Sequence, residues 1–208
     1  ATGVAFALGD SGDTFTIPSG ATISNLGTAT GFGGLVKVHT ITASDSANVA
    51  FSSTYLTSTY KRYTLEAYNI QSATDDVYFN MHFSTDNGSG YTPGGVTRIN
   101  ISNQSGNGND AIQSRNTAGQ SQLQLGGAVN FGTGTGEVGA YTFQLVNFSD
   151  TAHYKLMYYN GALYNSGATG GINAGAAVVN TTSAINNIKF DFQSGNIAAG
   201  TFILYGIL

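Results

Sequence analysis

The hydrophobic pattern of this chain repeats every two residues, and this period restricts the possible folds more than any other feature. The clearest example reads VYFNMHF over residues 77–83, where large apolar residues alternate with tyrosine, asparagine and histidine. Successive side chains of a strand point to opposite faces of a sheet, so this pattern predicts a half-buried antiparallel strand. No stretch of ten or more residues combines a helical period with capping residues, which predicts an all-β fold.

Strands of the same kind are expected along the chain, about ten in all. The others span residues 35–41, 48–52, 60–70, 98–102, 122–125, 141–148, 154–159, 185–192 and 201–207. Turn-forming residues separate strands at 72–76, 86–90, 160–161 and 194–196. Two long stretches rich in Gly, Asn and Ser, residues 104–120 and 165–176, are too polar to pack as core. They are predicted to be surface excursions.

Short strands without covering helices must bury their apolar faces against one another. We therefore expect an antiparallel, jelly-roll-like β-sandwich over residues 35–208. Residues 14–27 hold two short apolar stretches around a Pro-Ser-Gly turn, and residues 31–34 have the composition of a flexible joint. Two such short strands cannot bury their faces alone, so residues 1–34 are predicted to be a short N-terminal β arm for docking or oligomer contacts.

Composition argues against several classes of partner. The chain of 208 residues carries only 7 Lys and Arg against 11 Asp and Glu. So few cations cannot neutralise a run of phosphates, and we expect no nucleic-acid partner. No apolar stretch approaches the roughly 20 residues that cross a bilayer, so no membrane insertion is expected. Cysteine is absent, which excludes disulfides and thiolate metal sites.

The ionisable residues form no recognisable catalytic or metal-binding pattern. His39, His82 and His153 are scattered over the predicted strands without metal-site spacing. Asp75 and Asp76 are adjacent in a predicted turn, whereas a retaining glycosidase needs two carboxylates about 5 Å apart across a cleft. We therefore predict no catalytic residue, no metal ligand and no cofactor.

Two glycine-containing motifs are predicted to be structural. GTGTG at residues 132–136 lacks the lysine and the strand-to-helix context of a phosphate loop, so it predicts an inter-strand loop. STDNGSGY at residues 84–91 resembles the Asp-box hairpin of sialidases, with Gly90 and Tyr91 in place of Thr and Trp. Asp86 is expected to accept hydrogen bonds from its own turn, and Gly88 to supply a positive φ. The resemblance implies a rigid hairpin without hydrolysis; a calcium ion held by Asp86 and Asn87 is the alternative.

Both ends of the chain resemble parts of bacteriophage proteins. The sequence IKFDFQSGNIAAGTFILYGI, residues 188–207, is similar to the final hairpin of a family of bacteriophage virion proteins. Residues 12–33, GDTFTIPSGATISNLGTATGFG, resemble a short module of phage tail-fibre and other appendage proteins. The resemblance covers nearly the whole chain and also includes residues 35–51, 60–70 and the Ser-Thr-Asp-Asn-Gly segment at 84–88. It implies a place on the virion surface and carries over no catalytic residue.

A group of tyrosines around residue 160 indicates a candidate sugar contact. Tyrosine rings stack on sugars and asparagine amides bond their hydroxyl groups, so such side chains on a sheet suit a glycan. The expected contact residues are Tyr154, Tyr158, Tyr159, Asn160 and Tyr164. The alternative is that these tyrosines are ordinary strand residues of a core or an interface.

These features favour a non-enzymatic bacteriophage virion structural protein, a fibre, spike or capsid decoration subunit on the particle surface. We expect a symmetric homo-oligomer, with a trimer favoured by the resemblance to appendage proteins. The arm is expected to contact other virion proteins, and the tyrosine group a host surface glycan. The alternative is a free carbohydrate-binding module or adhesin, and a polysaccharide-degrading enzyme is less favoured because no carboxylate pair is indicated.

Overall fold

The computed structural model describes residues 35–91, 93–105, 112–125, 130–165 and 169–207. The arm predicted for residues 1–34 lies outside the described residues, as do residues 106–111 and 166–168 of the two predicted surface excursions. The described part of the chain contains no helix, and hence none long and apolar enough to span a membrane. The predicted all-β class is confirmed.

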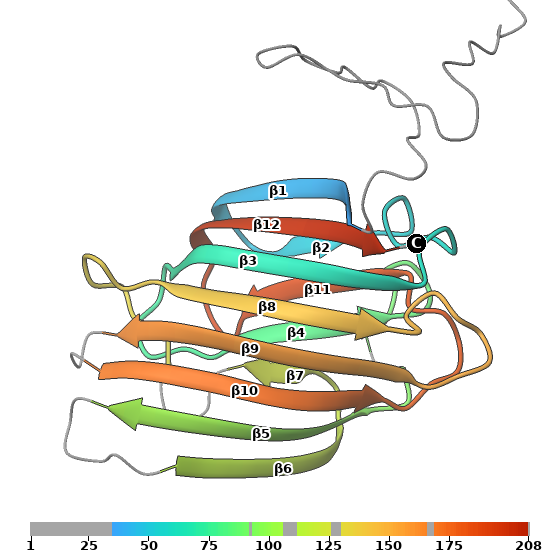
Figure 1. The fold of residues 1–208 in the computed structure, drawn as a ribbon. Coiled ribbons are helices and arrows are strands. Elements are labelled where there is room, and N and C mark those ends of the chain that lie inside the picture. Colours follow the sequence, from blue (N-terminus) through green and yellow to red (C-terminus); the bar gives the residue numbers. More distant parts are fainter. Residues whose placement is uncertain (1–34, 92, 106–111, 126–129, 166–168, 208) are drawn as a thin grey trace, which may run out of the picture. The chain divides into compact units, whose positions relative to one another are not determined.

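Twelve strands run through the described residues (Figure 1). They are β1 (Val36–Ser46), β2 (Val49–Phe51), β3 (Arg62–Ser72), β4 (Phe79–Ser84), β5 (Val96–Ser105), β6 (Ile112–Gln120), β7 (Leu123–Leu125), β8 (Gly139–Val146), β9 (Lys155–Asn165), β10 (Thr169–Val179), β11 (Asn187–Phe192) and β12 (Ile197–Ile207). An eight-stranded sheet has the order β1-β12-β3-β8-β9-β10-β5-β6, and a four-stranded sheet the order β2-β11-β4-β7. Neighbouring strands are antiparallel throughout, which confirms the predicted antiparallel sandwich.

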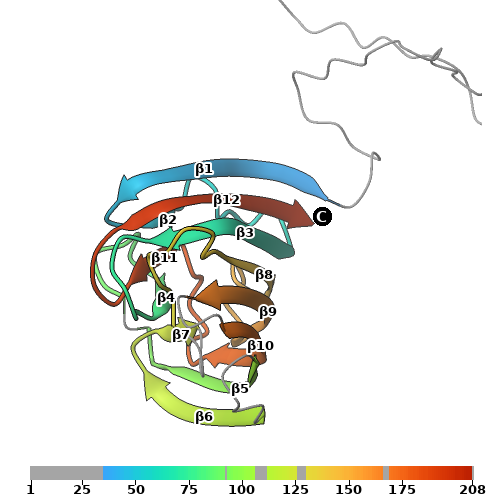
Figure 2. The same cartoon turned by 90° about the vertical axis from the view of Figure 1, so that its left-hand side faces the viewer.

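The order of the strands is that of a jelly roll with two inserted hairpins. The four-strand sets β1-β12-β3-β8 and β2-β11-β4-β7 make the two sheets of the jelly roll. The hairpin β5–β6 is inserted between β4 and β7, and the hairpin β9–β10 between β8 and β11. Both hairpins extend the larger sheet beyond β8, and Figure 2 shows that sheet curving around the smaller one. The insertions therefore give the sandwich one unusually broad outer face.

Aromatic side chains from both sheets fill the space between them. Phe79 and Phe190 of the smaller sheet stack with ring centroids 5.5 Å apart, and Phe202 of the larger sheet lies 5.4 Å from Phe190. The four large apolar side chains predicted to share one face at residues 77–83 are all buried, but the opposite face is not open, because Asn80 is buried as well. Burying a side chain of this size stabilises the fold by roughly 1.5–3 kcal/mol, so this layer is a principal source of stability.

Three predictions about irregular segments are wrong. The stretches 104–120 and 165–176, expected to be surface excursions, contain β6 and most of β10, and the expected turn at 160–161 lies inside β9. The rings of neighbouring tyrosines explain why glycines are tolerated here. Tyr141 occupies the space in which a side chain of Gly161 would lie, and Tyr159 does the same over Gly175. The rings cover the glycine backbone and replace the packing that a side chain would supply.

Candidate functional site

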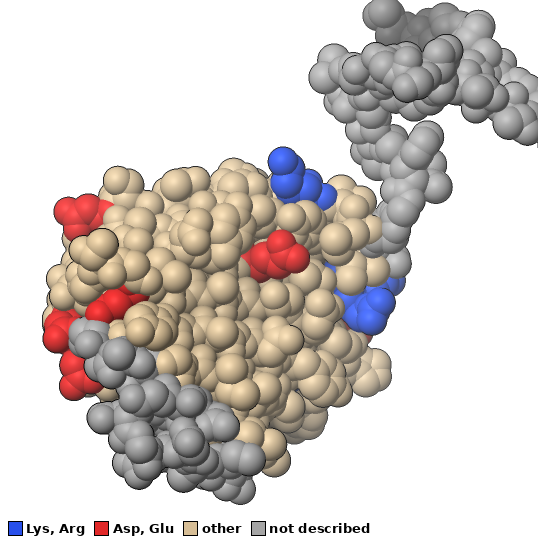
Figure 3. Space-filling model, turned by 60° about the vertical axis from the view of Figure 1, so that its left-hand side comes forward, with Lys and Arg blue, Asp and Glu red and all other residues tan. Residues whose placement is uncertain are grey.

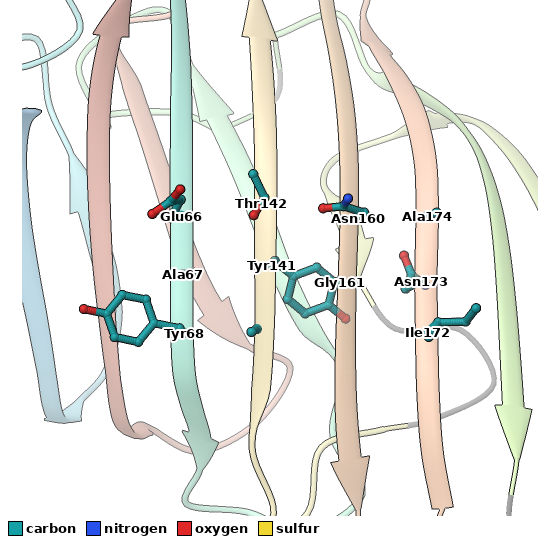
Figure 4. Close-up of a pocket in the computed structure, with 11 residues that line it drawn as sticks. Glu66, Ala67, Tyr68, Tyr141, Thr142, Asn160, Gly161, Ile172, Asn173 and Ala174 are labelled. Carbon is teal, nitrogen blue, oxygen red and sulfur yellow. The ribbon is translucent and has the colours of Figure 1, made fainter. Parts of the chain in front are cut away.

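The outer face of the eight-stranded sheet, which points away from the smaller sheet, carries the strongest candidate for a binding site. Strand register places Glu66 of β3 opposite Thr142 of β8, Thr142 opposite Asn160 of β9, and Asn160 opposite Ala174 of β10. Figure 4 shows these four residues as one row across four strands. Segments far apart in the sequence thus combine into one surface.

A shallow groove of about 570 Å³ runs over this row, and we call it the sheet groove. It is lined by Glu66, Ala67, Tyr68, Ala140, Tyr141, Thr142, Asn160, Gly161, Ile172, Asn173 and Ala174. A second depression of about 340 Å³ shares Tyr68 and Ala140 with it and extends to Tyr164. The groove is hollow because small residues form much of its lining, whereas the larger Tyr68 and Ile172 stand exposed beside them.

The sheet groove combines hydrogen-bonding groups with apolar edges. Glu66 offers a carboxylate, Thr142 a hydroxyl and Asn160 an amide, so the row contains both donors and acceptors. Tyr68 and Ile172 add a ring and an aliphatic side chain. A sugar presents hydroxyl groups at its edge and C–H groups on its face, and this lining matches both. Glu66 is the only charged residue among those lining the groove, which disfavours an anionic ligand.

The structure divides the predicted sugar-contact residues between two faces and two ends of β9. Tyr158, Asn160 and Tyr164 alternate along the outer face, where both tyrosines are exposed. Tyr154 is also exposed but precedes β9, about 33 Å along an extended strand from Tyr164. These two tyrosines therefore do not share one small site.

The prediction that Tyr159 contacts a sugar is wrong. Its side chain is only 4% exposed and faces the core, because it alternates with the outward residues of β9. Burial raises its pKa to about 12, against smaller opposing effects of Arg98 and Asn100. Tyr159 packs in the core and is not available to a ligand on the outer face.

Four groove residues that are used in the binding argument were missed at the level of sequence: Glu66, Tyr68, Thr142 and Ile172. The alternation within residues 60–70 is enough to put Glu66 and Tyr68 on one face of a strand. It does not indicate that β3 pairs with β8, which brings both residues next to Thr142 and Asn160. That pairing joins residues about 75 positions apart and has no local sequence signal.

The turn at residues 84–91 has the predicted local hydrogen bonds, but the predicted hairpin is wrong, because β4 and β5 on either side of it belong to different sheets. The Ser84 hydroxyl donates to Asp86 Oδ1 at 2.6 Å, and the Gly90 amide donates to the same oxygen at 2.8 Å. These hydrogen bonds hold the pKa of Asp86 below its usual value. Gly88 has a φ of 94°, and its amide donates to Ser84 Oγ. Asp86 is thus engaged within its own turn.

The histidines have separate neighbours. His82 lies 2.8 Å from Asp191, which also pairs with Lys189 at 2.8 Å. His153 lies 3.1 Å from Asp150, and His39 stacks on a tyrosine ring at 3.9 Å. Within the described residues, no group of three or more His, Cys, Asp or Glu side chains is placed to hold a metal ion.

The GTGTG segment forms a loop between strands, held by an acidic side chain. Glu137 Oε2 accepts a hydrogen bond from the Gly134 amide at 2.9 Å, and the Glu137 amide donates back to the Gly134 carbonyl. The Glu137 carboxylate lies where side chains of Gly132 and Gly134 would be. A carboxylate in this position repels a phosphate, so the loop is unsuited to binding one.

Comparison with known proteins adds no relative: no protein-family model, no curated protein and no solved structure matches the chain.

Proposed function

We propose that the chain is a non-enzymatic structural protein of a bacteriophage virion, a fibre, spike or capsid decoration subunit exposed on the particle. In this proposal it forms a homo-oligomer, with a trimer favoured, and contacts other virion proteins through residues 1–34. Its sheet groove contacts a glycan of the host surface. The C-terminal resemblance supports the virion assignment, and jelly rolls occur among viral capsid and lectin domains. Fold alone does not establish function, so the glycan contact rests on the groove.

The single observation that carries the glycan contact is the polar row Glu66–Thr142–Asn160 in an open groove edged by Tyr68 and Ile172. A sugar chain lying across the strands meets a hydrogen-bonding group on each of three successive strands. The aromatic ring and the aliphatic side chain add contact with its C–H faces. Because Glu66 repels anions, the groove favours a neutral or amino sugar over an acidic one.

The single carboxylate that lines the groove supports a binding role over hydrolysis. Glycoside hydrolysis in most enzymes uses two carboxylates that flank the scissile bond. Glu66 is the one carboxylate among the residues that line the groove. A polysaccharide-degrading enzyme is therefore the less favoured alternative. Hydrolysis of a host polysaccharide that is lost on replacing Glu66 would favour it.

A free carbohydrate-binding module or adhesin is the second candidate, and the same groove supports it. The two candidates differ in assembly and in location. A virion subunit is expected in purified phage particles, where mass spectrometry detects it. A free module is expected to bind glycan tightly as a monomer and to be absent from particles.

The glycan contact is tested with an array of bacterial surface glycans and the full chain. The double substitution Thr142→Ala and Asn160→Ala removes two hydrogen-bonding groups, each contributing about 1 kcal/mol, so binding should weaken about 10-fold or more. Thr40→Ala, at an exposed position of β1, is the matched control and should bind as the wild type does. Equal binding by the double variant, or no binding by the wild type, would contradict the glycan contact.

A further inference from the structure

Beside the sheet groove, the outer face carries an exposed apolar patch. Ile99 and Ile101 of β5 are 60% and 54% exposed, and Ile172 of β10 is 59% exposed. Folding normally buries such β-branched side chains, and monomers rarely expose several large ones together. We define the isoleucine patch as Ile99, Ile101, Leu156, Tyr158, Ile172, Ala174 and Ala176.

Strand register makes the isoleucine patch continuous. Ile99 is opposite Ala176, which in turn is opposite Tyr158 of β9. Ile101 is opposite Ala174, and Ile172 lies two residues from Ala174 on the same face of β10. The isoleucines therefore stand next to one another, with alanines between them and the tyrosine.

The strands beneath the patch are regular. The pairs β5–β10, β10–β9 and β8–β9 keep their register without interruption. By contrast, register shifts interrupt the pairings of β1 with β12, β12 with β3, β3 with β8 and β5 with β6. A regular sheet surface with small residues between larger ones can approach a second sheet closely and interdigitate with it.

The strands that carry the patch have no charged side chain on the described part of their outer faces. Among the described side chains that point outward from β5, β8, β9 and β10, none is charged. Figure 3 shows a largely uncharged surface on this side; most of the acidic side chains in view gather at one border of the molecule, and one stands apart from them. A partner chosen by charge would find nothing to pair with here. Two copies of this chain, despite the net charge of −4 on each, bring no like charges together through this patch.

The exposed area also suits a second copy. Three isoleucines, Leu156 and Tyr158 expose several hundred Å² of apolar surface, comparable with the largest patches of monomers at roughly 300–600 Å². Tyr164 continues the exposed surface along the same face of β9. A standard interface buries about 800 Å² on each partner, so this face is large enough to supply most of one.

We propose that copies of this chain associate through the isoleucine patch, so that the outer faces of their β5, β9 and β10 strands pack together. This inference rests on the homo-oligomer of the proposed function and adds the surface through which the copies associate. It depends on neither the virion location nor the glycan contact. Ile172 and Ala174 belong to both the patch and the sheet groove. The two surfaces therefore overlap on β10, and association covers this edge of the groove, whereas Glu66 and Thr142 lie on β3 and β8, outside the associating strands.

The test measures the molar mass of the full chain by size-exclusion chromatography with light scattering. The wild type should show a multiple of 21.5 kDa at micromolar concentration. The double substitution Ile99→Glu and Ile101→Glu places carboxylates in the apolar contact and should weaken association at least 100-fold, giving the monomer. Thr42→Glu, at an exposed position on β1 of the same sheet, is the control and should assemble as the wild type does.

A labelling measurement remains informative even if the glutamate variant fails to fold. The natural chain has no cysteine, so Ile101→Cys and Thr42→Cys each introduce one thiol. Maleimide should react with the thiol at position 101 at least 10-fold more slowly in the oligomer than in dilute monomer, and equally fast in both at position 42. Equal rates at position 101, or an oligomer that survives the glutamate substitutions, would show that the copies do not associate through the isoleucine patch. Neither result would contradict the homo-oligomer itself. A monomeric wild type would overturn both.

Discussion

Lys155 permits the most specific prediction about stability. Its side chain is fully buried at the start of β9, at 0% exposure. Its ammonium group donates hydrogen bonds to the carbonyl oxygens of Asp150, His153 and Thr182 at 2.6, 2.7 and 2.9 Å. Burial lowers its pKa, and the nearby charge of Asp150 opposes this effect. Lys155 thus joins the segment between β8 and β9 to the segment between β10 and β11.

The substitution Lys155→Met keeps most of the apolar stem and removes the three donors. A buried carbonyl left without a donor costs about 1–3 kcal/mol. All three carbonyls belong to segments with exposed residues, where water can replace the lost donor, so the low end applies and the total is about 3 kcal/mol. For a chain of this size, that loss lowers Tm by about 6–12 °C.

The measurement is thermal unfolding followed by circular dichroism, with urea unfolding as a second readout. Lys37→Met is the matched control, because Lys37 is exposed on β1 and its loss should change stability by less than about 0.5 kcal/mol. If the two variants melt at the same temperature, the three hydrogen bonds of Lys155 do not stabilise the fold and the reasoning is refuted.

Two further predictions concern stability at acidic pH and the substitution of glycines in β10. Hydrogen bonds lower the pKa values of Asp86 and Asp150. At Asp191, burial raises the pKa, but hydrogen bonds with His82 and Lys189 oppose this effect and the net shift is downward. A carboxyl group whose pKa is lower in the folded state stabilises the fold at pH values above its unfolded-state pKa, and this stability is lost as pH falls through the folded-state pKa. Urea midpoints should therefore fall as pH drops from about 5 to about 2, and they should fall less with pH in the triple Asp→Asn variant. Identical pH profiles of the two proteins would contradict this. Gly175→Ala places a Cβ 2.6 Å from a carbonyl oxygen and a tyrosine hydroxyl and should cost about 1–3 kcal/mol, whereas Gly170→Ala on the same strand meets nothing within 4 Å. Equal melting temperatures for these two variants would show that the close contact relaxes freely.

Local features of the sequence were sufficient for the fold class and for one element in detail. The two-residue period predicts strands because it follows from the geometry of an extended chain, wherever that chain pairs. The turn at residues 84–91 was predictable with its hydrogen bonds, since Ser84, Asp86 and Gly88 act on their own turn; that the strands on either side of it join different sheets was not. The sandwich follows from the lack of helices to cover the sheets.

Signals based on residue type failed where tertiary contacts opposed them. Asn160 and Gly161 have the composition of a turn, yet they continue β9 because the ring of Tyr141 covers the glycine. Residues 112–120 are polar, yet they form β6 by pairing with β5 at the edge of the sheet. The composition of a segment reflects only its average propensity for a strand or a turn, and backbone pairing with a neighbouring strand outweighs that propensity.

The alternation of side chains, and with it an antiparallel β-sandwich, is determined by the amino-acid sequence alone, because neighbouring residues impose it. Only the tertiary structure decided that Glu66, Thr142 and Asn160 share a groove, that Ile99 and Ile172 share a patch, and that Lys155 is buried. These arrangements depend on which strands pair and in which register. Pairing is set by the closure of the whole core over long sequence separations, and no local segment contains that information.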